Sequence, residues 1–534
     1  MHSGLRRTKV LSATALFAAA SLHAVRARAD EPIKATEPSL MSEPGEIVDV
    51  VDAFDEKNKD PFDLHLSLGF VQSWESAKIK RESNLGPDGK ESDAGFGHNI
   101  ENIAKYSHTW STLNLRADIG IFHDLGFFIR LPLTLADDRS LDDLDGSAKG
   151  VNAGAPNGRA YDTANGKPFF NLPFKSPTRS GIDYLAVGLR YSIFNQMRDP
   201  TKPTWTVELE GRFGIGEPMH PCNANPDPVT AAANAAASTG TVKSTATTYP
   251  QCPTAGSSVF SETTQTWYRN PADGGKTPGI SRGTNAIKLG TMVSERYRYV
   301  EPYGGFWFMA EFQKRGTEMG DFSGLQGVIT NHPPVQGGLI GGVMIHPWEN
   351  RENFQRFSID LRFKGTYVSQ GRDYTPLFDA LGTSQAPSLI APNPGSYRGA
   401  TDSKGNPISV GDYSKPIAFT GVTDVEAHGI FGGAVAFVVQ AGQYIKFSGG
   451  VGMQYVQAYL ASSSDACNPD VRPGANDGTA GRCKTDTSST TTSKTETTGT
   501  PNPNHRPNID LPGRRFRVTE NFIWDAWLTG TVMF

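Results

Sequence analysis

The chain has 534 residues, of which 20% are charged, and its formal net charge is -4 at pH 7. This balance argues against a nucleic-acid partner, because binding to phosphates requires clustered Lys and Arg. The length suits either several soluble domains or one large closed sheet with big loops.

The N-terminus, residues 1–29, has the parts of a secretory signal peptide. The basic stretch "LRRTK" precedes an apolar run of small residues, and "ARA", ending at Ala29, precedes Asp30. This order predicts export and cleavage after Ala29. A membrane anchor is the alternative, but the apolar run is broken by polar residues and is too short to cross about 30 Å of hydrocarbon.

The segment that follows, residues 30–60, is acidic and contains several prolines. It is expected to be a periplasmic leader, either solvated or forming a short element that docks at the barrel mouth or on a periplasmic partner.

Beyond residue 60, apolar residues occupy every second position in about twelve stretches. Such alternation predicts strands with one apolar and one polar face. The first stretch, "FDLHLSLGF", places Leu64, Leu66 and Leu68 on one face, and the last, "WDAWLTGTVMF", repeats the pattern up to Phe534. Pro132 is a flaw in "FFIRLPLTL", because proline cannot donate a ladder hydrogen bond. Between these come the remaining stretches, STLNLRADIGIF, IDYLAVGLRYSIF, TWTVELEGRFGIG, AIKLGTMVSERY, YGGFWFMAEFQKR, VQGGLIGGVMIH, FSIDLRFKGTYVS, VEAHGIFGGAVAFVV and YIKFSGGVGMQYVQAYL.

The links between the stretches alternate between short and long. The long ones cover residues 81–106, 136–180, 217–283, 316–334, 371–423 and 461–515. No window of 18 consecutive apolar residues follows the signal, but a strand that shows only one face to lipid would not produce one. An open sheet edge in hydrocarbon would leave backbone groups unpaired, so the first strand must pair with the last.

These patterns predict an all-β chain: residues 61–534 form a closed antiparallel transmembrane β-barrel of about 12 strands. Short turns and both termini are expected in the periplasm and the long loops outside the cell, in the outer membrane of a Gram-negative bacterium.

The C-terminal residues carry a resemblance to known proteins. Leu528, Val532 and Phe534 lie on one face of the last stretch and resemble the signal by which bacterial outer-membrane barrels are recognised for insertion, although the family's glycine tends to lie one residue before Gly530. That resemblance implies the barrel-assembly machinery as a partner. In addition, "IRLPLTL" and "SGIDYLAVGLRYSIF" resemble segments of the transporter-like outer-membrane family associated with meta-pathway phenol degradation, from which no functional residue carries over.

Charged residues on the inner face are the candidates for function. A charge facing lipid near the midplane costs about 2–4 kcal/mol, so parity assigns these residues to the lumen. They could either pair across strands and fill the barrel or line a path for polar or anionic solutes. The lumen candidates are Arg116, Asp118, Arg130, Arg190, Glu208, Glu210, Arg212, Lys288, Glu311, Asp360, Arg362, Lys364, Glu426, His428, Lys446 and Asp525.

Two further sets of residues complete the expectations. Aromatic residues gather near both ends of the strands, as in barrels with two interfacial girdles; those near the loop ends are Trp74, Phe213, Tyr367, Tyr455, Tyr459 and Trp524. The cysteines lie in long loops, which favours the disulfides Cys222–Cys252 and Cys467–Cys483, with free thiols as the alternative.

The sequence favours a porin-like channel for small solutes, held in outer-membrane lipid and lipopolysaccharide. The alternative is a plugged barrel that acts as an adhesion scaffold or as the outer-membrane partner of a periplasmic export system. Catalysis is not expected, because the motifs GxSxG and HExxH are absent and the histidines are isolated in sequence. No cofactor or metal is expected either, since "ADDRSLDDLDG" lacks the ligand spacing of a calcium loop.

Overall fold

The computed structural model describes residues 51, 53–55, 60–83, 99–144, 161–162, 167–170, 172–224, 278–314, 317–319, 332–384, 389, 420–462, 467–468, 500–501, 507–510 and 514–534. The predicted signal peptide and most of the leader and long loops lie outside these residues.

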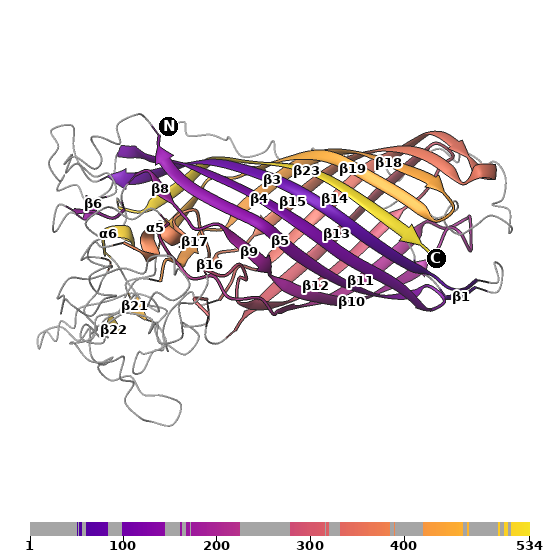
Figure 1. Cartoon of the computed structure of the whole chain (residues 1–534), viewed down its shortest axis with the longest axis horizontal. Helices are drawn as coiled ribbons and strands as arrows, with labels where there is room; N and C mark the ends of the chain where they lie inside the picture. Colours follow the sequence, from indigo (N-terminus) through magenta and orange to yellow (C-terminus); the bar gives the residue numbers. More distant parts are fainter. Residues whose placement is uncertain are drawn as a thin grey trace, which may run out of the picture.

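In the described part of the chain, twelve long strands form one ring (Figure 1). Each strand runs antiparallel to its neighbours, and the pairs β5–β10 and β23–β3 close the ring. The predicted closed antiparallel barrel is therefore confirmed. Its strands are β3 (Leu64–Ser83), β4 (Asn99–Phe122), β5 (Leu125–Asp143), β10 (Tyr184–Phe194), β11 (Thr204–Gly214), β12 (Thr284–Ser294), β13 (Val300–Gln313), β14 (Gln336–Asn350), β15 (Gln355–Val368), β18 (His428–Gly442), β19 (Ile445–Val456) and β23 (Phe516–Met533).

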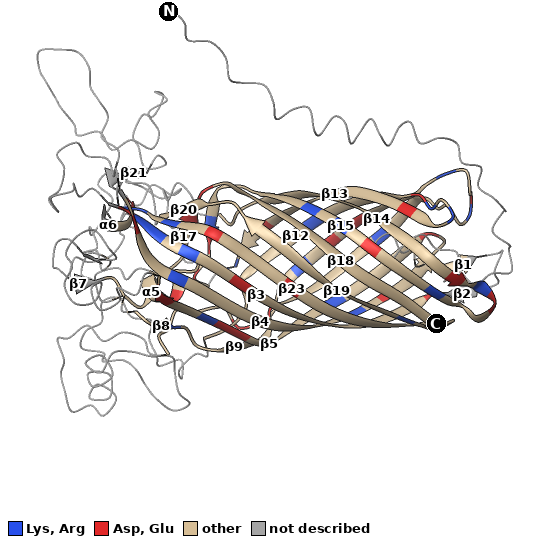
Figure 2. Cartoon of the chain, turned by 90° about the horizontal axis from the view of Figure 1, so that it is seen from above, with Lys and Arg blue, Asp and Glu red and all other residues tan. Residues whose placement is uncertain are grey.

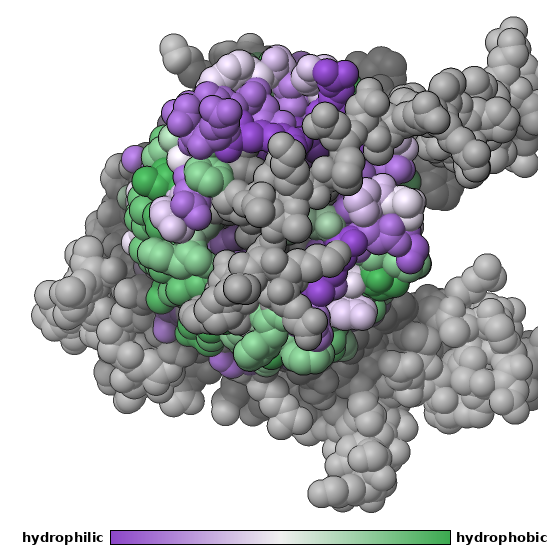
Figure 3. Space-filling model, turned by 90° about the vertical axis from the view of Figure 1, so that its right-hand side faces the viewer, coloured by the Kyte–Doolittle hydropathy of each residue, from purple (hydrophilic) through white to green (hydrophobic). Residues whose placement is uncertain are grey.

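The outer wall of the barrel is apolar. Large side chains such as Phe306, Leu528 and Val451 are each about 60% exposed. Viewed from the turn end, apolar residues cover the left and lower sides of the wall, and hydrophilic residues lie at the top (Figure 3). A continuous exposed apolar surface of this size is suited to lipid rather than water. No helix among the described residues is long and apolar enough to cross a membrane.

The first and last strands pair as predicted. Leu64 and Phe534 exchange two backbone hydrogen bonds of 3.0 Å, and Leu66 lies opposite Val532. The C-terminus therefore lies at the turn end of the barrel, the same end as β1 (Ala53–Asp55) (Figure 1).

Some strands are longer than predicted. The predicted loop 81–106 begins too early and ends too late, because β3 continues to Ser83 and β4 starts at Asn99. Beyond Trp74 the outward residues of β3 are polar, so the apolar alternation ends while the backbone ladder continues. Pro132 lies opposite Asn114 of β4. On its other side it falls in a gap, because β5 pairs with β10 only up to Arg130 and with β9 (Arg179–Ile182) only from Leu133, so no ladder donor is needed on that side.

The long links contribute small elements at the loop end (Figure 1). The helix α5 (Phe378–Gly382) packs into an apolar cluster with Phe169, Phe170 and the inner-wall residues Ile79 and Phe516. We call this cluster with α5 the loop-end cap. The other small elements of the long links are β6 (Tyr161–Asp162), β7 (Lys167–Pro168), β8 (Phe174–Lys175), β16 (Gly371–Asp373), β17 (Thr423–Val425), β20 (Tyr459–Ser462), β21 (Cys467–Asn468), β22 (Thr500–Pro501) and α6 (Pro507–Asp510). At the turn end lie β2 (Asp60–Phe62), which precedes β3, and η3 (Arg351–Asn353), which connects β14 to β15.

Candidate functional site

The inner face of five consecutive strands, β4, β5, β10, β11 and β12, carries a network of ion pairs. Glu210 accepts hydrogen bonds from Arg130 at 2.7 Å and from Arg212 at 2.5 Å. Glu208 lies 2.8 Å from Arg190 and 3.4 Å from Lys288. On β4, Arg116 holds Asp118 through two hydrogen bonds of 2.6 and 2.7 Å.

We call these eight residues the charged wall. Its five cations exceed its three anions, so the wall carries a formal excess of two positive charges.

A further cation, Lys364 on β15, faces the same lumen. Its side chain is exposed, although Leu361 and Phe363 beside it lie on the outer wall. The Lys364 Nζ atom lies 5.5 Å from the centre of the Trp307 ring. Within the described residues Lys364 forms no salt bridge. Three cations, Lys288, Arg362 and Arg212, lie within its electrostatic range, together with one carboxylate, that of Asp525. A water-accessible cation with more cations than anions around it is a local site for an anion.

Small residues create room for aromatic rings on the inner wall. A Cβ atom at Gly338 would lie 2.7 Å from the Trp307 Nε1 atom, and one at Gly188 would lie 2.4 Å from the Phe128 ring. Each ring therefore occupies space above a glycine of the neighbouring strand. Because Gly338 has no side chain, the Trp307 indole can lie over it and beside Lys364.

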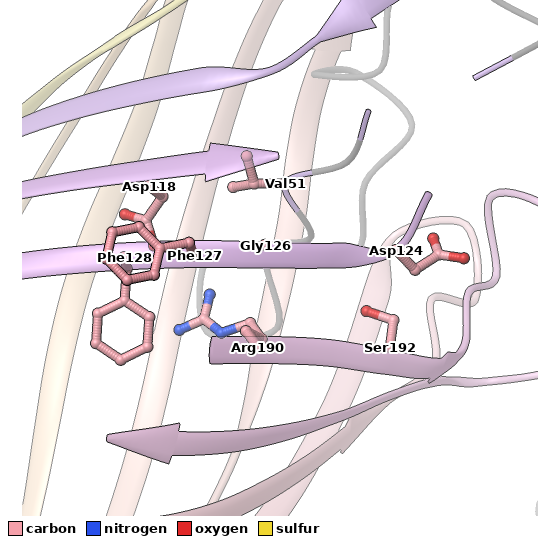
Figure 4. Close-up of a pocket in the computed structure, with 8 residues that line it drawn as sticks. All are labelled: Val51, Asp118, Asp124, Gly126, Phe127, Phe128, Arg190 and Ser192. Atoms are coloured by element: carbon pink, nitrogen blue, oxygen red, sulfur yellow. The ribbon is translucent and has the colours of Figure 1, made fainter. Parts of the chain in front are cut away.

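At the turn end, part of the leader reaches the barrel. Ala53 and His123 exchange backbone hydrogen bonds of 3.1 and 2.8 Å, so a short strand does dock at the barrel mouth, while residues 30–50 lie outside the described residues. Val51 is buried and borders a small pocket together with Asp118, Phe128 and Arg190 (Figure 4).

At the loop end, a buried ion pair fixes the cap. Arg179 donates hydrogen bonds of 3.0 and 2.6 Å to the two carboxylate oxygens of Asp379 on α5. The side chains are 0% and 3% exposed, and Asp379 also accepts a hydrogen bond from the backbone N–H of Cys222. This end of the barrel is therefore narrowed by packed protein on the side of β3, β4 and β23.

The remaining lumen candidates are distributed over several places. Asp360 accepts hydrogen bonds of 2.6 Å from Tyr303 and Arg362. Asp525 is held by Ser73 and Gln454. Two others lie elsewhere: Glu311 pairs with Arg282 near the loop end, and Lys446 is buried on β19 near the turn end.

Glu426 differs from its predicted position. It is exposed in the link before β18, and its carboxylate accepts a hydrogen bond from the backbone of Leu460, so it lies at the loop-end rim. His428, the first residue of β18, stacks on Tyr459. Tyr459 is itself buried in the loop-end cap and is not part of an outer girdle.

The structure describes all three insertion-signal candidates, but the side chain of only one of the four cysteines. Leu528, Val532 and Phe534 all lie on the outer wall, and their role in insertion stays a prediction. Cys222 is buried, but Cys252, Cys483 and the side chain of Cys467 lie outside the described residues, so the disulfides stay predictions too.

Sequence reasoning missed several polar clusters, because their members come from distant strands. His108 lies 3.1 Å from both Glu75 and Asp137. His346 lies 2.8 Å from Ser358 and 3.3 Å from Glu301. The sequence pattern that indicates such clusters is the recurrence of polar residues at every second position, which places them on the inner faces of the strands. No cluster of three or more His, Cys, Asp or Glu in the described ranges is arranged to hold a metal ion.

Two charged residues in the links next to the strands, Arg282 and Asp183, have shifted pKa values. Burial would lower the pKa of Arg282, but Asp373 and Glu311 raise it well above its usual value. Burial raises the pKa of the Asp183 carboxyl despite the hydrogen bond from the Arg282 backbone. Arg282 therefore stays charged and links β16 to the end of β13.

The ring of strands, its apolar outer wall and its charged interior define the class of this protein: an outer-membrane-type β-barrel. No protein-family model matches the chain, and no curated protein matches its sequence.

Solved structures of outer-membrane proteins show a distant likeness. One is an outer-membrane channel from Pseudomonas putida F1, with 7% identity, a TM-score of 0.30, and coverage of 88% of this chain and 95% of that one. A second is a FadL homologue from Pseudomonas aeruginosa, with 9% identity, a TM-score of 0.30, and coverage of 88% and 90%. A third is the P. putida toluene transporter TodX, with 11% identity, a TM-score of 0.26, and coverage of 93% and 94%. With TM-scores this low, we draw no inference from these structures.

Proposed function

We propose that this protein is a restricted outer-membrane channel that favours small anionic solutes. Its long loops face the outside of the cell, its turns and termini face the periplasm, and its role is transport rather than catalysis. The loop-end cap makes the path narrower than that of an open porin.

One observation carries this proposal. The charged wall has more cations than anions, and Lys364 adds an exposed cation that has no salt bridge among the described residues. If the lumen served only to hold the barrel together, each charge would be expected to have an opposite partner, because unpaired charges inside a barrel contribute nothing to its stability. An excess of one sign instead raises the local concentration of the opposite ion.

Planar-bilayer recording in membranes free of lipopolysaccharide tests the proposal. The wild-type barrel should give discrete conductance steps and an anion-selective reversal potential in a KCl gradient. Lys364→Glu changes the lumen charge by two units. At about 7 Å in water this change disfavours an anion by about 1 kcal/mol and favours a cation by about the same amount, so the ratio of anion to cation permeability should fall roughly 30-fold.

Lys202→Glu is the matched control, because Lys202 lies in an exposed turn outside the lumen. It should leave the selectivity unchanged. A conducting barrel that is cation-selective would overturn the preference for anions, and a folded barrel without conductance would overturn the channel itself.

The loop-end cap supports a second candidate function. Because packed apolar residues fill part of this end, a closed barrel that presents its loops to a partner, or that serves a periplasmic export system through its leader, is the alternative. Silence of the folded wild type in the bilayer would favour it.

A further inference from the structure

Four cations lie together on the outer wall of three neighbouring strands at the loop end. We call Lys78 and Lys80 on β3, Lys105 on β4 and Arg517 on β23 the basic rim. Figure 2 shows basic positions gathered on β3 and its neighbours at this end of the barrel.

The strand register places like charges directly opposite one another. Lys78 lies opposite Lys105, and Lys80 lies opposite Arg517. Residues opposed in an antiparallel pair have Cβ atoms about 4.5–5.5 Å apart, and like charges at this distance are destabilising. Two such pairs lie side by side, so negative charge close to them is stabilising.

The protein itself supplies little of that charge. Glu520 forms a salt bridge with Lys78 and lies 3.8 Å from Lys80. Asp142 lies opposite Lys105 in the register and borders the rim on β5. Neither Lys105 nor Arg517 forms a salt bridge within the described residues. Four cations against two acids leave two positive charges unbalanced.

The position of the basic rim along the barrel axis indicates which layer of the membrane it faces. Trp74, Phe522 and Trp524 form the last exposed aromatic residues of β3 and β23, and such residues mark the membrane interface. Lys78 follows Trp74 by four positions on the same strand face, with the polar Ser76 between them. At about 3.3 Å per residue and a strand tilt of about 40°, the backbone of Lys78 lies roughly 10 Å beyond Trp74 and that of Lys80 roughly 15 Å. That is the level of lipid headgroups.

We propose that the basic rim binds the phosphate groups of lipid A, the membrane anchor of lipopolysaccharide, in the outer leaflet. The inference rests on the orientation given in the proposed function, with the loops outside the cell, and does not depend on conductance. Clusters of four or more Lys and Arg at the membrane surface attract anionic headgroups, and the planar Arg517 guanidinium suits a phosphate particularly well.

Native mass spectrometry of the full-length barrel in detergent provides the test. The probe is bisphosphorylated lipid A, with dephosphorylated lipid A and inorganic phosphate as separate arms. The triple variant Lys78→Gln, Lys80→Gln, Lys105→Gln should bind bisphosphorylated lipid A at least about tenfold more weakly than the wild type, since each cation near an anionic surface adds up to about 1 kcal/mol. The variant should fold normally, because it removes two like-charge pairs.

The matched control is Lys202→Gln, Arg298→Gln, Arg351→Gln, which removes three cations from the turn end. It should bind lipid A as the wild type does. Equal affinities of the wild type and the first triple variant, equal losses in the two triple variants, or equal wild-type affinity for dephosphorylated lipid A would each overturn the proposal. Labelling of the long loops from the periplasmic side would overturn it together with the orientation, whereas conductance in a bilayer free of lipopolysaccharide reports on the channel alone.

Discussion

At the level of single residues, some aromatic rings of the inner wall pack directly against a glycine, where a larger residue would collide with the ring. A Cβ atom added at Gly188 would lie 2.4 Å from the Phe128 ring and 2.6 Å from the carbonyl oxygen of Leu209. We expect Gly188→Ala to lower the free energy of unfolding by about 1–3 kcal/mol, because both the ring and a backbone atom must move. Urea unfolding in phospholipid vesicles, followed by tryptophan fluorescence, measures this change.

A second glycine provides the control for that experiment. A Cβ atom at Gly442 would meet nothing within 4 Å, so Gly442→Ala should change the free energy of unfolding by less than about 0.5 kcal/mol. Equal effects of the two substitutions would show that the contact with Phe128 does not determine the stability of this wall.

At the level of elements, the twelve strands and their closure could be predicted because lipid enforces the alternation. A residue such as Leu66 or Val532 must be apolar where it faces acyl chains, so the period of two is visible in the sequence. The ends of β3 and β4 could not be predicted in the same way. Beyond Trp74 the wall leaves the lipid, and polar residues such as Ser76 and Lys78 satisfy the same backbone ladder.

The candidate site was predicted only in part, because parity assigns a face but not a partner. Parity places Arg130 and Glu210 on the inner face, but the sequence separates them by many residues and does not predict that they pair. No pattern in the sequence predicts the loop-end cap. Its helix α5 spans only five residues, which is too short to show a helical period.

The α5 helix depends on its buried ion pair. Arg179→Met removes the partner of Asp379 and leaves a buried carboxylate uncompensated, which typically costs about 3–5 kcal/mol. We expect the loop-end cap to loosen, and amide hydrogen exchange of residues 378–382 should accelerate by at least about 100-fold while the barrel strands keep their protection.

An exposed ion pair serves as the comparison for Arg179→Met. Lys202 lies 3.2 Å from Asp199 at the surface, with side chains 51% and 42% exposed, so Lys202→Met should change neither the cap nor the strands measurably. If exchange of α5 stays slow in Arg179→Met, the apolar contacts of Leu377, Ala380 and Leu381 hold the cap without the ion pair.

At the level of the whole molecule, the arrangement of polar and apolar residues is reversed relative to a soluble protein. The outer wall exposes side chains such as Phe306 and Leu528, whereas Glu210 and Asp360 are buried inside. This reversal is stable only in a medium that does not hydrogen-bond, where the ring of strands leaves no open edge.

The last prediction tests this claim by depth. The outward residues of β19 run from Ile445 at the turn end through Val451 to Tyr455 toward the loop end. An arginine on the lipid face costs about 2–4 kcal/mol at the midplane and about 0–1 kcal/mol near an interface. Unfolding of Val451→Arg, Ile445→Arg and Tyr455→Arg in vesicles should therefore give the largest loss at Val451. In water all three positions would tolerate arginine equally, because an exposed surface charge needs no desolvation, so a flat profile would mean that this wall does not face hydrocarbon.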